Sequence, residues 1–500
     1  MESKSSFLII SSFIFFLLFL AKIYKQKIKM RSHKLPPGPW KLPLIGNLHQ
    51  LALAGKLPHH TLGDLSHKYG PLMHLQLGEI STVVVSSPNL TKEIMKTHDL
   101  SFVQRPQFLA PNILTYESKD IIFASYGDYW RQMRKICTSE LLSAKRVQSF
   151  SSIREDGVEK MIQFIHSSSC QDPLDLTKMV SSLVSSFVSR ATFGKKSKYE
   201  DDLLCLLKQA MEMASGFDVA DLFPSFKPIH LITGIKPKLE NLQKKLDMIL
   251  ESIINEHQSN PALQGENLVD VLLRIQQRSS LEIPITQDNV KAVIWDMFGG
   301  GSDTSAITIE WAMSELMKNP RVMKKAQAEI REAVKGKKRI YESDLHKLGY
   351  LKLVIKETLR LHPPATLLMR ECREACNIGG YEIPLKTNLI LNAWAIGRDP
   401  EHWSDAEKFI PERFHDSTGF DFNKVNDNSF QYFPFGGGRR MCPGILFGLA
   451  NIELPLAALL YHFDWKIPNE MKEEDLDMTE VFGATVSRKN NLFLIPTQYI

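Results

Sequence analysis

The sequence predicts a mainly α-helical protein with a smaller β portion, folded as one large domain. Helical hydrophobic patterns follow one another from about residue 125, and no Pro-, Gly- or Ser-rich linker interrupts them. Alternating or β-branched runs, typical of strands, are confined to residues 71–86, 377–391 and 484–496. A hydrophobic content of 43% and a charged content of 23% are ordinary for a globular protein.

Hydrophobic periodicity places the main helices over residues 288–318, 321–336, 344–361 and 444–462. The first of these is about 45 Å long at 1.5 Å per residue, which is enough to cross a domain. Asn319-Pro320 ends it, because proline cannot continue the helical hydrogen-bond ladder. No internal repeat is visible in the chain.

Charge and cysteine content exclude several classes of protein. A net charge of +5 over 500 residues, without an interleaved basic and aromatic patch, argues against nucleic-acid binding. The six cysteines are too few and too scattered for a disulfide scaffold. Cys372 and Cys376 could form half of a metal site, but no second pair at zinc spacing accompanies them, so we interpret both as reduced thiols.

The N-terminus carries an apolar run over residues 7–21, and a basic stretch that begins at Lys22 follows it. We expect a membrane anchor over residues 1–24, a basic and proline-rich hinge over 25–45, and the main domain over 46–500. A cleaved signal peptide is the alternative, but the charge follows the apolar run and no small-residue cleavage site precedes it. The positive-inside rule then places the main domain in the cytosol.

The most informative segment runs from Phe435 to Gly444, with the sequence Phe-Gly-Gly-Gly-Arg-Arg-Met-Cys-Pro-Gly. Glycines let the backbone approach a flat cofactor, and their N–H groups can point at the sulfur of Cys442. Pro443 suits the first turn of a helix, whose N-terminus favours an anion. The guanidinium of Arg440 matches a carboxylate such as a porphyrin propionate. A glycine-rich turn with a buried cysteine is the structural alternative.

The spacing F-x-x-G-x-R-x-C-x-G resembles the haem-binding loop of the cytochrome P450 family, with every signature position filled. The resemblance implies the α-rich fold of that family, haem b as cofactor, and Cys442 as the axial ligand of the iron. Phe435, Arg440 and Gly444 would contact the haem. The proline-rich hinge resembles that of microsomal members, and the segments 435–444 and 477–483 are similar to the plant group that oxidises terpenoids.

A second unusual feature is three consecutive glycines, 299–301, in the middle of the longest predicted helix. Each costs about 1 kcal/mol relative to alanine in a helix interior, so they need a reason. Close approach of a flat ligand is one, and a tight crossing of two helices is another. The segment is similar to the oxygen-binding helix of the family, which implies that Asp303 and Thr304 relay protons to the iron-bound ligand. Gly300 occupies a position where the family more often has alanine.

Further arginines take their expected roles from the same resemblance. Glu357 and Arg360 form an E-x-x-R pair, and together with Arg413 of a P-E-R-F segment they would build a buried structural network. Trp130 and Arg134 match the W-x-x-x-R helix whose side chains contact a haem propionate, which would leave Arg131 and Lys135 facing a partner. Arg370 is a further propionate candidate, with a surface arginine as the alternative.

The expected substrate pocket is apolar and combines parts of residues 102–122, 211–226, 292–304, 363–369 and 481–486. We expect its lining to include Phe298, Gly300, Ala365, Thr366, Leu367, Leu368, Phe482 and Ala484, any of which would otherwise be plain core.

Together these features imply an endoplasmic-reticulum monooxygenase that takes electrons from an NADPH-dependent reductase and inserts one atom of O2 into a hydrophobic molecule. A plant sesquiterpene or diterpene is the expected substrate, with a phenolic or an alkaloid as alternative. Two other functions stay open: a reductase-independent hydroperoxide isomerase, and a haem-binding sensor or electron carrier.

Overall fold

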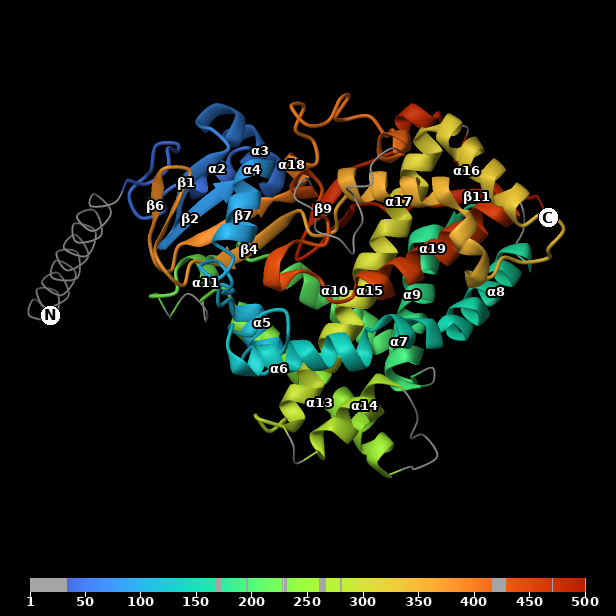
Figure 1. Cartoon of the computed structure of the whole chain (residues 1–500), viewed down its shortest axis with the longest axis horizontal. Helices are drawn as coiled ribbons and strands as arrows, with labels where there is room; N and C mark the ends of the chain where they lie inside the picture. Colours follow the sequence, from blue (N-terminus) through green and yellow to red (C-terminus); the bar gives the residue numbers. More distant parts are fainter. Residues whose placement is uncertain are drawn as a thin grey trace, which may run out of the picture.

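The computed structural model describes residues 34–167, 172–194, 197–226, 228, 232–259, 267–278, 281–415, 429–469 and 471–499. The predicted anchor over residues 1–24 and the first part of the hinge lie outside the described residues. The remainder confirms a mainly helical protein with a minor β portion, whose largest sheet lies at the left in Figure 1.

The helices follow the order α2 (Leu48–Ala52), α3 (Pro58–Tyr69), α4 (Pro88–Lys92), α5 (Leu109–Leu114), α6 (Asp128–Ile136), α7 (Ala144–Ser149), α8 (Ser151–Ser167), α9 (Leu176–Phe193), α10 (Glu200–Met213), α11 (Val219–Leu222), α13 (Ile235–Ser259), α14 (Leu268–Gln276), α15 (Gln287–Lys318), α16 (Pro320–Ala333), α17 (Gly349–Leu361), α18 (Ala393–Ile396) and α19 (Ile445–His462). The strands are β1 (Leu72–Leu77), β2 (Ile80–Val85), β3 (Leu174–Asp175), β4 (Leu367–Glu371), β5 (Cys376–Ile378), β6 (Tyr381–Ile383), β7 (Asn388–Asn392), β8 (Phe463–Lys466), β9 (Glu480–Phe482), β10 (Val486–Arg488) and β11 (Phe493–Gln498).

Helix α15 is the axis of the molecule and crosses it in Figure 1. It begins at a capping box, in which the Thr286 side chain accepts from the Asn289 N–H and the Asn289 side chain accepts from the Thr286 N–H. Its glycines do not interrupt it. Almost every side chain beyond its first turn is buried, because α9, α14, α17 and α19 pack around it.

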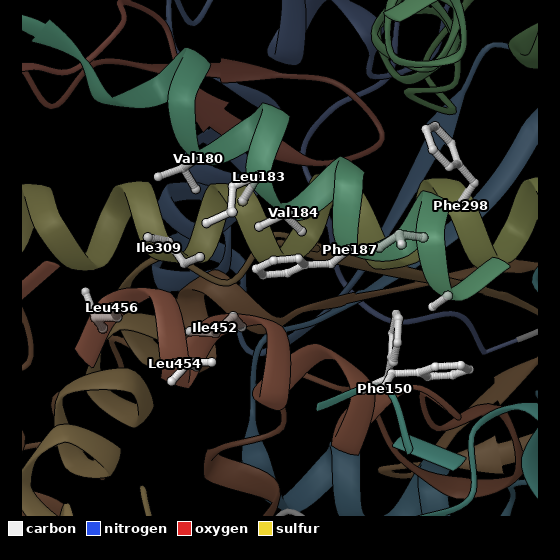
Figure 2. Packing of buried hydrophobic residues seen from close by; sticks show 14 of the residues in the cluster. Phe150, Val180, Leu183, Val184, Phe187, Phe298, Ile309, Ile452, Leu454 and Leu456 are labelled. Carbon is white, nitrogen blue, oxygen red and sulfur yellow. The ribbon is translucent and has the colours of Figure 1, made fainter. Parts of the chain in front are cut away.

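The main hydrophobic core lies where α9, α15 and α19 meet. Figure 2 shows Val184 and Phe187 of α9 close to α15, with Ile452 of α19 on the other side of that helix. Helix α19 is the one helix within the described ranges that is long and apolar enough to cross a membrane, but 72% of that stretch is buried inside the protein. Its apolar character therefore reflects its place in the core.

The largest sheet has the strand order β1-β2-β7-β4, in which β2 and β7 run parallel and the other pairs are antiparallel. Strand β4 brings Arg370 opposite Leu389 of β7. Two smaller pairs, β5-β6 and β9-β10, and the sheet β3-β11-β8 complete the β portion. The β9-β10 pair matters most for the site, because it reaches back toward α15.

The described part of the proline-rich hinge docks on the body of the protein. The His74 N–H donates to the Pro37 carbonyl over 2.8 Å, and the Glu382 N–H donates to the Lys34 carbonyl over 3.0 Å. A Cβ at Gly38 would lie 2.1 Å from the His74 carbonyl oxygen, so glycine is required for this approach. The segment from residue 34 onward is therefore part of the folded body and not a free spacer.

Candidate active site

Cys442 lies in a tight loop that closes on itself immediately before α19. The Cys442 N–H donates to the Phe435 carbonyl over 3.0 Å, and the Gly444 N–H donates to Cys442 Sγ over 3.3 Å. Gly438 has a φ of 64°, a left-handed value that favours glycine, and a Cβ there would lie 2.2 Å from Asp99 Oδ1. The loop therefore fixes the sulfur at the N-terminus of α19.

The surroundings of Cys442 suit a metal-bound sulfur. Desolvation by the surrounding protein atoms raises the pKa of the Cys442 thiol, although the residue is exposed, while the Gly444 N–H and the guanidinium of Arg134 act in the opposite direction. A coordinated metal ion deprotonates a thiol outright, and the N–H donor and the arginine then stabilise the thiolate. Gly444 is the N-cap of α19, so Pro443 precedes the helix, whereas the sequence suggested a place in its first turn.

Four arginines from four separate segments gather beside this loop: Arg105, Arg134, Arg370 and Arg440. Burial and the repulsion among these guanidiniums lower the pKa of Arg440 to about 9 and that of Arg105 to about 10, and they also lower the pKa of Arg370. Their hydrogen bonds go mostly to backbone carbonyls, which leave the positive charge unbalanced. Such a cluster requires anionic groups from a ligand.

The hydrogen bonds of Arg370 indicate which kind of ligand fits the cluster. Its Nη2 donates to the Gly437 carbonyl over 3.1 Å, while its Nη1 is buried without a partner among the described residues. The nearby carboxylate of Asp99 pairs instead with Arg439, over 2.7 Å. The two propionates of a haem offer two carboxylates for these guanidiniums, and the arginine cluster and the cysteine loop therefore fit that cofactor.

Trp130 and Arg440 form one packed unit beside the cluster. The indole N–H of Trp130 donates to the Ile121 carbonyl over 3.0 Å, and the Arg440 guanidinium lies 4.4 Å from the Trp130 ring centroid. The Arg440 side chain also donates to the Val103 and Ala124 carbonyls over 2.9 and 2.6 Å. In this arrangement Trp130 packs against Arg440, one of the four clustered arginines.

The three glycines of α15 have different surroundings. A Cβ at Gly299 would lie 3.0 Å from Leu207 of α10, and one at Gly301 would lie 3.1 Å from Val188 of α9. A Cβ at Gly300 would meet nothing within 4 Å. Tight helix packing therefore explains the outer two glycines, while the middle one faces open space.

The turn that follows these glycines carries the predicted acid and alcohol. Asp303 Oδ2 accepts a 2.6 Å hydrogen bond from the Thr485 hydroxyl, and the Thr304 hydroxyl donates to the Gly300 carbonyl over 2.7 Å. Burial raises the pKa of Asp303, and the Thr485 hydrogen bond lowers it in part. Burial makes the charged form of Asp303 less favourable, so this carboxyl keeps its proton to a higher pH than a free aspartate does.

The start of α19 lies against this same turn. A Cβ at Gly301 would be 3.2 Å from the Phe447 ring, and a Cβ at Gly448 would be 3.8 Å from Ser305 Oγ. Since Cys442 immediately precedes α19, the helix contact brings the cysteine loop next to the Gly300–Thr304 turn. The site therefore brings together the Cys442 thiol, the arginine cluster and the Asp303–Thr304 pair.

Glu357, Arg360 and Arg413 form a fully connected buried network. Glu357 pairs with Arg360 over 2.7 Å and with Arg413 over 3.0 Å. Arg360 also donates to the Gly397 and Ala406 carbonyls over 2.6 and 2.7 Å. The network ties α17 to the segment over residues 397–413, and it supports the fold without facing the arginine cluster directly.

The residues expected to line the substrate pocket divide into two groups. Ala484 and Gly300 are exposed, and Ala365, Leu367, Leu368 and Phe482 are partly exposed. Phe298 is only 1% exposed and lies between Phe193 and Trp295, while Thr366 is buried. We therefore place Phe298 and Thr366 behind the wall of the pocket.

Two groups near the site have no counterpart in the predicted set of site residues. Arg105 lies in a stretch interpreted only as pocket lining, and no spacing rule links it to the other arginines. Asp120 and Asp296 form a buried carboxyl pair that accepts hydrogen bonds from the N–H groups of Phe123 and Ile121. Burial raises the pKa of Asp120 to about 6, and burial together with the charge of Asp120 raises the pKa of Asp296 well above its ordinary value.

The chain matches one protein family and several plant enzymes over nearly its full length. The family description "Cytochrome P450" matches residues 36–495 of the chain. Cytochrome P450 71D8 of Glycine max is 59% identical, with 100% of this chain and 99% of that protein covered. Premnaspirodiene oxygenase of Hyoscyamus muticus is 53% identical over 99% and 98% of the two chains. Desmethyl-deoxy-podophyllotoxin synthase of Sinopodophyllum hexandrum is 54% identical over 98% and 97%.

Among solved structures, a zebra fish cytochrome P450 with progesterone superimposes with a TM-score of 0.74 at 26% identity. The superposition covers 89% of this chain and all of the zebra fish chain.

Proposed function

Because this chain belongs to the cytochrome P450 family and is a haem monooxygenase, we propose that it oxidises a sesquiterpene hydrocarbon. The observation that carries the proposal is that the contact between α15 and the start of α19 brings the Cys442 loop next to the Asp303–Thr304 turn, with the arginine cluster beside that loop. The relative named premnaspirodiene oxygenase, at 53% identity over nearly the full length, supports the substrate class.

Cys442 would hold the haem iron, and Arg134, Arg370, Arg105 and Arg440 would hold the propionates. Haem with a thiolate ligand supplies the activation of O2, which no side chain of the protein can perform. The Gly444 N–H, 3.3 Å from the sulfur, would moderate the charge of the thiolate. The arginines gain the anionic partners that their lowered pKa values indicate they need.

On the opposite side, Asp303 and Thr304 would move protons. Asp303 is held by Thr485 at one carboxylate oxygen, which leaves its other oxygen available to exchange a proton. The Thr304 hydroxyl, which donates to the Gly300 carbonyl, can accept a hydrogen bond at its oxygen and pass a proton inward.

The identity of the oxidised molecule rests on the apolar lining and on the relatives. Gly300, Ala365 and Ala484 leave room beside α15, and Phe482 offers an aromatic wall. These groups bury hydrocarbon without offering it a charged partner. A lignan of the podophyllotoxin type is the second candidate, because the desmethyl-deoxy-podophyllotoxin synthase is equally similar.

We also propose that an NADPH-dependent reductase donates the electrons, and that the chain acts at the endoplasmic-reticulum membrane. Arg131 and Lys135 are exposed on α6, the helix whose buried face carries Trp130 and Arg134. Their charge suits an acidic electron donor close to the haem edge. The basic stretch after the N-terminal apolar run supports the membrane assignment.

The first test is the reduced-plus-CO difference spectrum of the purified holoenzyme. Thiolate ligation by Cys442 predicts the red-shifted Soret band, and Cys442→Ser should lose it. An unshifted band in the wild-type protein would contradict the assignment of Cys442.

The second test supplies the enzyme with a reductase, NADPH and a panel of sesquiterpene olefins and lignans. We expect oxygenated sesquiterpenes only when NADPH and O2 are both present. Oxidation of lignans alone would favour the second candidate, and turnover of hydroperoxides without NADPH would show an isomerase.

A further inference from the structure

A cluster of imidazoles and carboxylates lies away from the cysteine loop, between α3, β9 and the end of α17. His59 Nε2 and His60 Nε2 converge on Glu480 Oε2, over 2.9 and 3.0 Å. The three potential ligand atoms lie within 4.8 Å of one another. Glu480 is 421 residues away from His59 in sequence, so only the tertiary fold assembles this group.

A fourth side chain is aimed at the same point. His362 Nδ1 is buried, has no hydrogen-bond partner among the described residues, and lies 3.8 Å from Glu480 Oε1. Its other ring nitrogen, Nε2, bonds Glu315 Oε1 over 2.7 Å. A neutral ring that donates from Nε2 to a carboxylate carries a lone pair on Nδ1, and this is the arrangement by which carboxylates orient metal-binding histidines.

We propose that His59, His60 and Glu480 form a site for a divalent transition-metal ion, of which Zn²⁺ is the best match, with His362 or water as fourth ligand. Two imidazoles and one carboxylate are a donor set that tetrahedral zinc accepts, at metal–ligand distances of about 2.0–2.2 Å. Nitrogen and oxygen donors at about 3 Å separation need only small rotations to reach those distances.

Charge and access both suit the ion. The carboxylates of Glu480 and Glu315 balance a charge of +2, and the neighbouring Arg398 pairs with Glu407 over 3.2 Å. A cavity of about 1120 Å³ is lined by His60, Glu315, His362 and Glu480, so the ion has a route from solvent. His59 itself is fully buried, which distinguishes this group from the more exposed cluster Asp399, Glu401 and His402.

The ion would act structurally. Glu480 is the first residue of β9, and Phe482, the last residue of that strand, stacks on His59 with ring centroids 5.9 Å apart. Binding of zinc would therefore fasten the hairpin that carries Phe482 and Thr485 to the first turn of α3. Anything that binds the folded state alone raises its stability by mass action.

The test uses the untagged full-length holoenzyme. After incubation with Zn²⁺ and removal of free metal, the zinc-to-iron ratio is measured by mass spectrometry, with haem iron as the internal reference. We expect a ratio close to one, and a thermal midpoint that rises with Zn²⁺. His60→Gln and Glu480→Gln should weaken zinc binding at least tenfold in a chelator competition and abolish the thermal shift.

His67→Gln, on the same helix, is the matched control and should retain zinc, as should His402→Gln in the exposed cluster. The reduced-plus-CO spectrum of each variant checks that it folds and holds haem, independently of zinc. The proposal is overturned if the wild-type ratio stays far below one, if folded His60→Gln and Glu480→Gln bind zinc like the wild type, or if His402→Gln alone loses it. None of these outcomes bears on the assignment of Cys442.

Discussion

The Thr485 hydroxyl and the Asp303 carboxyl form a 2.6 Å hydrogen bond that joins the β9–β10 hairpin to the middle of α15. The turn before Thr485 is itself held from two sides, because the Ala484 N–H donates to the Met211 carbonyl and the Val486 N–H donates to the Pro364 carbonyl. The position of the Asp303 carboxyl therefore depends on the hairpin that carries Phe482 and Ala484, two residues expected to line the pocket.

Replacement of Thr485 by valine should impair proton transfer while preserving shape. The hydrogen bond lowers the pKa of Asp303 against the effect of burial, so its loss raises that pKa further. Ionisation of Asp303 then requires a higher pH, and the acidic limb of the profile of kcat against pH moves to higher pH. A hydrogen bond worth about 1 kcal/mol corresponds to a shift of roughly 0.7 pH unit, and the pH profile of product formation should move by that amount.

The matched control is Thr479→Val, because Thr479 bonds Asp477 at an exposed position on the other side of β9. If Thr485→Val and Thr479→Val have the same pH profile as the wild type, Thr485 does not position Asp303.

Removal of the Thr304 hydroxyl should separate NADPH consumption from product formation. Thr304→Ala leaves the helix intact but removes the oxygen that lies 2.7 Å from the Gly300 carbonyl. Electrons would still be consumed, and they would be released as peroxide or water instead of product. We expect product per NADPH to fall several-fold in Thr304→Ala and to recover in Thr304→Ser. An unchanged ratio in the alanine variant would remove Thr304 from the proton route.

The two packing glycines and the open glycine of α15 should respond differently to alanine. Alanine gains about 1 kcal/mol of helix propensity at each position. Gly300→Ala meets no atom within 4 Å, so it should keep or raise the thermal midpoint while altering the product distribution. Gly301→Ala would press on Val188 and Phe447, at 3.1 and 3.2 Å, and overpacking costs about 1–3 kcal/mol.

Thermal unfolding and product analysis of the two variants check this difference. A midpoint for Gly301→Ala equal to that of Gly300→Ala would show that α9 and α19 yield to the added methyl group.

Arg370 should govern haem retention. Its Nη1 is buried without a partner among the residues that the structure describes, and burial together with the neighbouring guanidiniums lowers its pKa, so it gains most from a propionate. Arg370→Gln should reduce the haem-to-protein ratio and speed haem transfer to apomyoglobin by about tenfold, which corresponds to about 1.4 kcal/mol. Arg373→Gln, three residues away and exposed, is the control and should match the wild type. Equal transfer rates for all three proteins would contradict the role of Arg370.

Elements of secondary structure with a local sequence signal could be predicted from the sequence. The strand pattern over residues 71–86 is found as β1 and β2, and the helix predicted over 288–318 is found as α15, one residue longer at its start. The helix expected from residue 344 begins only at Gly349, because a 3₁₀ turn over Glu342–Lys347 precedes it. Strand β4 was not predicted, since its five residues show no alternation and its partner β7 lies about twenty residues away.

Site residues that are contiguous in sequence could likewise be predicted, and those joined only by the tertiary fold could not. The glycines around Cys442 and the acid–alcohol pair after the glycines of α15 are recognisable because each group is contiguous in sequence. Arg105 and Thr485 could not be found in this way. Arg105 joins Arg370 across 265 residues, and Thr485 joins Asp303 across 182 residues, so neither contact leaves a spacing in the sequence. Only the packing of the strands and α15 brings them together.

The buried pair Asp120 and Asp296 should make stability depend on pH. Both carboxyls have an unfolded-state pKa of about 3.9. In the folded protein burial raises the pKa of Asp120 to about 6 and also raises the pKa of Asp296 well above its ordinary value. The folded state therefore binds a proton that the unfolded state has already released. This contribution to stability is present at low pH and is lost as the pH rises through about 6 and above.

Asp296→Asn should flatten that dependence. The asparagine oxygen can still accept the Ile121 N–H, and its amide can donate to Asp120, which then ionises without a neighbouring negative charge. One unit of pKa difference is worth about 1.4 kcal/mol. The free energy of unfolding of Asp296→Asn should therefore exceed that of the wild type by about 1 kcal/mol at pH 8 and by little at pH 5. Asp288→Asn, in the exposed first turn of α15, is the control and should run parallel to the wild type. The measurement is the thermal midpoint of each protein from pH 5 to pH 8. Parallel curves of midpoint against pH for Asp296→Asn and the wild type would show that Asp120 and Asp296 share no proton.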